Sequence, residues 1–93
     1  MAAKEYSQKV KIINRLGLHA RAAGKLRNLA EKFPCKIEVI RGNVTANAKS
    51  VLGLMALEGS KGRDLEIRAK GPQAEVAVRA LVELIENRFG EDE

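Results

Sequence analysis

Apolar and polar side chains alternate in four stretches of this chain. The first stretch begins after Tyr6, extends to Ile13 and spans about seven residues. The other three are 36–41, 44–46 and 64–69. Because successive side chains of a strand point to opposite faces, each stretch predicts a strand with one buried face. Gly42-Asn43 separates the second and third stretches and is typical of a tight turn, so we expect a hairpin there.

A helical repeat governs two longer segments. Apolar residues recur at three- and four-residue spacing from about Ala20 to Phe33 and from about Gln73 to Arg88, with charged residues between them. Each pattern predicts a helix with one buried face, and Pro34 should stop the first. Ser50 is a good helix cap and precedes a short apolar segment, which predicts a helix of about two turns there.

These elements follow one another as βαββαβα in a single domain, residues 1–93. Four strands of alternating pattern favour an antiparallel sheet with one solvated face, and the three helices should cover its other face. We therefore expect an α+β fold.

The counts of cysteine and histidine limit the kinds of bond and metal site that the chain can form. Cys35 is the single cysteine and His19 the single histidine, which excludes an internal disulfide and leaves no ligand cluster for zinc. We expect no metal and no other cofactor. Cys35 is either a reactive thiol or a small core residue, and its place before an apolar strand favours the core.

The apolar runs fall short of the roughly 20 residues that cross a bilayer, and the first residues lack the apolar region of a signal peptide. We therefore expect a soluble, cytoplasmic protein without membrane insertion.

The net charge of +5 raises the question of nucleic acid. The basic residues are dispersed, however, and the aromatic residues that would stack on bases are few, which argues against nucleic-acid binding. A basic face that attracts acidic protein partners fits the composition better.

The most informative residue is His19, in the run Gly17-Leu18-His19-Ala20-Arg21 at the start of the first predicted helix. The first amides of a helix, here those of Ala20 and Arg21, bind anions, and imidazole is a competent nucleophile at neutral pH. Arg21 can add charge-assisted hydrogen bonds to phosphoryl oxygens. The alternative is a surface histidine without chemistry.

This run, together with Ala48-Lys49-Ser50-Val51-Leu52-Gly53-Leu54-Met55, resembles the HPr family of phosphocarriers of the bacterial phosphotransferase system. The resemblance covers about residues 6–88 and implies an open-faced β-sandwich. It implies that His19 accepts a phosphoryl group on Nδ1 from enzyme I, assisted by Arg21, and passes it to an enzyme IIA. Such a protein is a carrier and a monomer rather than an enzyme.

By the same resemblance, Ser50 is a regulatory serine, phosphorylated by an HPr kinase/phosphorylase in bacteria that possess one. A short helix cannot bury all its apolar residues, so some of them should stay exposed for partners. The predicted docking residues are Arg21, Lys25, Lys49, Val51, Leu52 and Met55.

An alternative reading is a regulatory adaptor that acts through phosphorylated Ser50 without phosphorelay, although such relatives lack the histidine that this chain keeps. The chain also departs from many family members by carrying Ala22 in place of proline. Asn14 and Leu16 are closer to the variants linked to nitrogen-related phosphotransfer than to those that serve sugar uptake.

Overall fold

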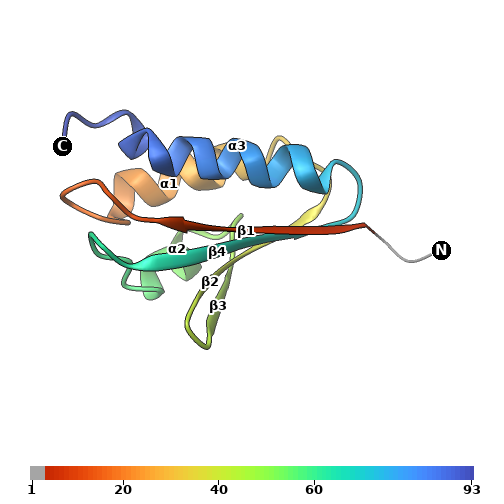
Figure 1. Cartoon of the computed structure of the whole chain (residues 1–93), viewed down its shortest axis with the longest axis horizontal. Helices are drawn as coiled ribbons and strands as arrows, with labels where there is room; N and C mark the ends of the chain where they lie inside the picture. Colours follow the sequence, from red (N-terminus) through yellow and green to blue (C-terminus); the bar gives the residue numbers. More distant parts are fainter. Residues whose placement is uncertain (1–3) are drawn as a thin grey trace.

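The computed structural model describes residues 4–93, and its elements follow the predicted order (Figure 1). The strands are β1 (Glu5–Lys11), β2 (Lys36–Arg41), β3 (Val44–Asn47) and β4 (Asp64–Lys70). The helices are α1 (Ala20–Ala30), α2 (Val51–Ala56) and α3 (Ala74–Glu86), followed by the 3-10 turn η1 (Arg88–Gly90).

The sheet is antiparallel throughout, with strand order β1-β4-β2-β3. Val39 of β2 lies opposite Ala46 of β3 on one side and Ile67 of β4 on the other, and all three are buried. The predicted β2–β3 hairpin and the predicted α+β class are confirmed. Helices α1 and α3 lie side by side over one face of the sheet, and α2 packs beside α1 and β3 (Figure 1).

The core consists mainly of aliphatic side chains from both layers. Its largest fully buried members are Phe89, Ile12, Leu26, Ile37, Leu54, Leu57, Leu65, Ile67, Leu81 and Ile85. Cys35 belongs to the same core at 2% exposure, which confirms its interpretation as a core residue. Within residues 4–93, no helix is long and apolar enough to cross a membrane.

Three helix boundaries differ from the prediction. Helix α1 ends at Ala30 instead of Phe33. Pro34 disfavours helical backbone angles at the residue before it, and the amides of Lys32 and Phe33 form turn-type hydrogen bonds instead. Helix α3 begins at Ala74 because Gln73 has a φ of 63°, and it ends at Glu86, before the left-handed residues of η1.

Strand β1 is also shorter at its end than predicted. It stops at Lys11, although Ile12 is buried and still exchanges backbone hydrogen bonds with Arg63 and Gly62. Ile13 is 37% exposed and begins the loop that leads to α1.

A close contact with Gly59 fixes the β1–α1 loop. The amide of Leu18 donates to the carbonyl oxygen of Gly59 at 2.7 Å. Gly17, next to it, has a φ of 66°, and a Cβ atom there would overlap the same carbonyl oxygen. Only glycine fits this backbone conformation and this close approach. The loop therefore delivers the following residues to the start of α1 in a fixed position.

We expect Gly17→Ala to lower the free energy of unfolding by about 3 kcal/mol, since it combines an unfavourable φ with a backbone clash. Gly42→Ala is the matched control, because Gly42 has a φ of 60° but open space around it; it should cost about 1 kcal/mol. Urea unfolding of both variants measures the difference. Equal losses would show that the contact with Gly59 does not constrain the loop.

Candidate functional site

His19 is the N-cap residue of α1, as the sequence predicted. Its backbone is extended, with φ −77° and ψ 178°, and its side chain makes no capping hydrogen bond. The first backbone bond of the helix runs from the amide of Ala23 to the carbonyl oxygen of His19 at 2.8 Å. The amides of Ala20, Arg21 and Ala22 precede that bond and are left to bind an anion.

The chain end folds back onto this histidine, which the sequence analysis did not anticipate. Nε2 of His19 lies 2.5 Å from Oε2 of Glu91, and the two side chains are 24% and 15% exposed. Figure 1 shows the C-terminus beside the β1–α1 loop. A cluster of acids near the C-terminus was visible in the sequence, but nothing in it indicated a contact with residue 19.

Asn14 connects Glu91 to the β1–α1 loop. Its Nδ2 donates to the carbonyl oxygen of Gly17 at 2.8 Å and to Oε1 of Glu91 at 3.0 Å. Asn14 is fully buried, and its Oδ1 has no partner among the described residues. In the sequence, Asn14 stands out only as a family variant, and no local pattern indicates this structural role.

Three hydrogen bonds and the burial of Phe89 hold the C-terminal segment. Phe89 is fully buried in the core, and Nζ of Lys25 donates to its carbonyl oxygen at 2.7 Å. The amide of Arg15 donates to the carbonyl oxygen of Glu93 at 3.0 Å, and Nε of Arg15 lies 3.2 Å from Oε2 of the same residue. Residues 89–93 are thus anchored on both sides of Glu91.

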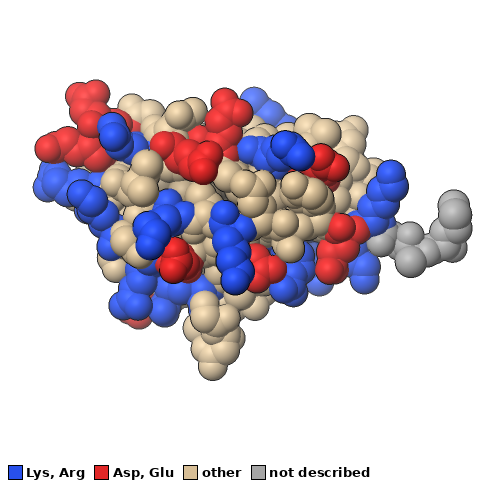
Figure 2. Space-filling view, in the orientation of Figure 1, with Lys and Arg blue, Asp and Glu red and all other residues tan. Residues whose placement is uncertain are grey.

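The environment of Glu91 favours its charged form. The hydrogen bond from His19, and then the one from Asn14, lower the pKa of the Glu91 carboxyl group, and the positive charge of Arg21 adds to the effect. Acidic and basic side chains lie next to one another at this end of the molecule (Figure 2). The site therefore presents a carboxylate on one side of the imidazole ring.

The predicted basic residues differ in their surroundings. Arg21 is exposed and takes part in no hydrogen bond or ion pair within residues 4–93, so its guanidinium is available to a ligand. Lys25 is held by Phe89, as described above. Nζ of Lys49 donates to the carbonyl oxygen of Phe33 at 2.9 Å. The last two therefore contribute to the fold as well as to the surface charge.

Ser50 caps α2 as predicted, since its Oγ accepts a hydrogen bond from the amide of Gly53 at 3.0 Å. The apolar residues behind it are partly exposed, as expected. Leu52 is 82% and Met55 41% exposed, whereas Val51 is half-buried. We call Val51, Leu52 and Met55 the α2 patch. It lies on the helix that packs beside α1.

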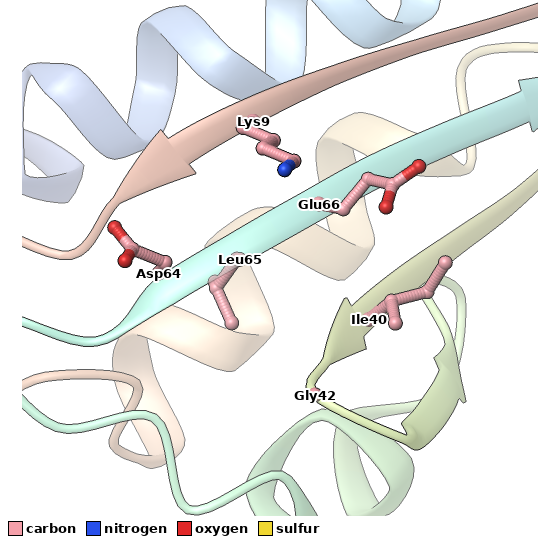
Figure 3. A pocket seen from close by; sticks show the side chains of 6 residues that line it. All are labelled: Lys9, Ile40, Gly42, Asp64, Leu65 and Glu66. Atoms are coloured by element: carbon pink, nitrogen blue, oxygen red, sulfur yellow. The ribbon is translucent and has the colours of Figure 1, made fainter.

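A cavity of about 410 Å³ lies on the solvated face of the sheet, apart from these residues. Its lining includes Lys9 on β1 and Glu66 on β4, which are cross-strand partners, together with Ile40, Gly42, Asp64 and Leu65 (Figure 3). This mixture of opposite charges and apolar groups provides no preference for an anion, so the candidate site remains at the start of α1.

Comparison with known proteins decides the family. The family model described as the phosphotransferase-system HPr component phosphorylation site matches residues 6–87. The chain belongs to the HPr family. It is accordingly a phosphocarrier of the phosphotransferase system.

Individual members of the HPr family support this assignment. Phosphocarrier protein HPr of Pseudomonas aeruginosa is 45% identical over 85 residues, covering 90% of this chain and 94% of the relative. Phosphocarrier protein NPr of Shewanella violacea is 43% identical over 84 residues, covering 90% and 92%. The crystal structure of HPr from Thermoanaerobacter tengcongensis matches with a TM-score of 0.90 and 41% identity, covering 95% and 99%.

Relatives named HPr and NPr match this chain about equally well, so similarity does not separate sugar uptake from nitrogen-type roles. The interpretation of Asn14 and Leu16 as nitrogen-type variants stays a prediction. The structural match does confirm the predicted open-faced sandwich.

The lowered pKa of Glu91 leads to a test of the closed C-terminal segment. A carboxyl group whose pKa is lowered by folding stabilises the folded state fully at pH values above its ordinary pKa. This stabilisation is lost as the pH falls through the lowered pKa. We expect His19→Ala to raise the Glu91 pKa, because the largest cause of the shift is removed. The carboxyl carbon of Glu91, followed by ¹³C NMR against pH, measures this.

Arg27→Ala is the control for this titration. Arg27 lies on the exposed side of α1, and its guanidinium hydrogen-bonds to Asn28. This variant should leave the Glu91 midpoint unchanged. An unchanged midpoint in His19→Ala as well would contradict the contact between His19 and Glu91.

Proposed function

We propose that His19 carries the phosphoryl group, accepting it from phosphorylated enzyme I and donating it to an enzyme IIA. The observation that carries this proposal is the position of the chain's single histidine at the start of α1, next to amides that no backbone bond of the helix uses. Family membership supplies the chemistry to which this geometry is suited.

The surroundings of His19 fit both halves of such an exchange. The amides of Ala20 and Arg21 and the guanidinium of Arg21 would hold the phosphoryl oxygens through charge-assisted hydrogen bonds. The histidine side chain remains 24% exposed, so an incoming nucleophile of the next protein can approach the phosphorus atom in line. The same site thus receives the group and releases it.

A docking surface adjoins this site. We propose that partners contact Arg21 and the α2 patch, where Leu52 presents the most exposed apolar side chain of its helix. Apolar contacts of this kind stabilise a complex, and nearby positive charge speeds the encounter with an acidic partner. Lys25 and Lys49 can contribute through their charge while keeping their hydrogen bonds to the backbone.

Phosphotransfer from radiolabelled phosphoenolpyruvate through enzyme I tests the carrier role. We expect wild-type protein to acquire a label that is lost in acid and retained in base, because a phosphoramidate is hydrolysed in acid. His19→Ala should acquire none. A label on His19→Ala, or an unlabelled wild type in the presence of a matched enzyme I, would refute the proposal.

We also propose that Ser50 is a regulatory phosphorylation site. Phosphorylation would place about two negative charges at the start of α2. The helix itself tolerates negative charge there, whereas the neighbouring α2 patch is apolar and Lys49 is basic. A phosphate on Ser50 would therefore hinder docking without unfolding the domain.

Ser50→Asp and Ser50→Asn separate charge from capping, because both residues are good helix caps and only one is charged. We expect Ser50→Asp to slow phosphorylation of His19 by enzyme I about tenfold, as expected for a misplaced charge at an interface. Ser50→Asn should stay near the wild-type rate. Similar melting temperatures would exclude unfolding as the cause, and an unslowed Ser50→Asp would contradict the regulatory role.

A further inference from the structure

Glu91 contacts one nitrogen of the His19 ring and leaves the other nitrogen free. Oε2 of Glu91 lies 2.5 Å from Nε2, whereas Nδ1 has no hydrogen-bond partner within residues 4–93. A carboxylate can accept hydrogen bonds but cannot donate them, so the proton of the neutral ring resides on Nε2. Nδ1 then keeps its lone pair.

We propose that Glu91 is a positioning residue for phosphotransfer, which holds His19 in the tautomer whose Nδ1 is the nucleophile. The proposal rests on the carrier function of His19. It adds a role for the C-terminal segment, which lies 72 residues from the histidine in sequence.

The hydrogen bonds of Asn14 explain why residue 91 has to be a carboxylate. Both hydrogens of its amide are in use, one on the carbonyl oxygen of Gly17 and one on Oε1 of Glu91. Because Asn14 is fully buried, its amide cannot rotate without losing the bond to Gly17. Residue 91 must therefore accept from Asn14 and from His19 at once, which a carboxylate does and an amide does not.

The carboxylate also matches the charge that develops during transfer. The lone pair of Nδ1 forms a bond to phosphorus, the bond from phosphorus to its donor atom breaks, and that electron pair returns to the donor. The proton on Nε2 stays, so the ring becomes positively charged. Glu91, itself 15% exposed, stabilises this charge where water screens it little.

Anchoring on both sides of residue 91 allows the carboxylate to act as a fixed group. Phe89 holds the segment in the core, and Glu93 is held by Arg15. Asp92 lies between them, and its side chain takes part in no hydrogen bond or ion pair in the described part of the chain. Asp92 thus offers a control of equal charge in the same segment.

The experiment compares Glu91→Gln with Glu91→Ala and with Asp92→Asn. Since Asn14 claims the amide oxygen of a glutamine at position 91, its amide nitrogen would face His19 and favour the tautomer with the proton on Nδ1. Imidazole ¹⁵N NMR at about pH 9, where an ordinary histidine is neutral, reads the tautomer directly. We expect a shift toward Nδ1–H in Glu91→Gln, and the wild-type tautomer in Asp92→Asn.

Phosphorylation rates provide the second readout. Glu91→Gln should be phosphorylated about tenfold more slowly than wild type, the scale of one hydrogen bond to a charged group, and more slowly than Glu91→Ala. A merely structural role would make the larger truncation, to alanine, the slower variant, and that order would overturn the proposal. So would an unchanged tautomer in Glu91→Gln. If wild-type protein is not phosphorylated, the carrier function fails, while the NMR comparison still decides the role of Glu91.

Discussion

The buried amide of Asn14 joins the two segments on which the candidate site depends. One of its hydrogens holds the β1–α1 loop through Gly17, and the other holds the C-terminal segment through Glu91. A buried amide that loses a partner leaves a polar group unsatisfied, which costs about 1–3 kcal/mol. The loop and the C-terminal segment are therefore coupled, and the geometry around His19 results from both.

A phosphocarrier must meet two opposing requirements. The phosphoryl group has to be held firmly enough to survive between partners, yet remain accessible for the next transfer. This chain divides the tasks between two sides of one ring. Glu91 holds Nε2 on the side closed by the chain end, whereas Nδ1 has no hydrogen-bond partner within residues 4–93. Rigidity on one side permits exposure on the other.

Local signals in the sequence predicted much of the fold and half of the site. His19 and Ser50 stand where a helix begins, and capping and hydrophobic period identify such positions without knowledge of the rest of the chain. The contact of Glu91 with His19 has no local signal, because it depends on a reversal of the chain after α3. Gly90, with a φ of 79°, marks a turn there, but Arg88 and Phe89 before it also adopt left-handed φ values of 58° and 55°, which no local sequence pattern indicates.

The left-handed conformation of Arg88 and Phe89 links the position of the chain end to the hydrophobic core. Non-glycine residues in this conformation cost on the order of 1–3 kcal/mol each, and burial of the Phe89 ring is what offsets the cost here. The direction in which the chain leaves α3 is thus set inside the hydrophobic core. A substitution among the core neighbours of Phe89 would therefore act on the position of the chain end as well as on the stability of the domain. Distance from His19 is then a poor guide to the residues on which the geometry of the site depends.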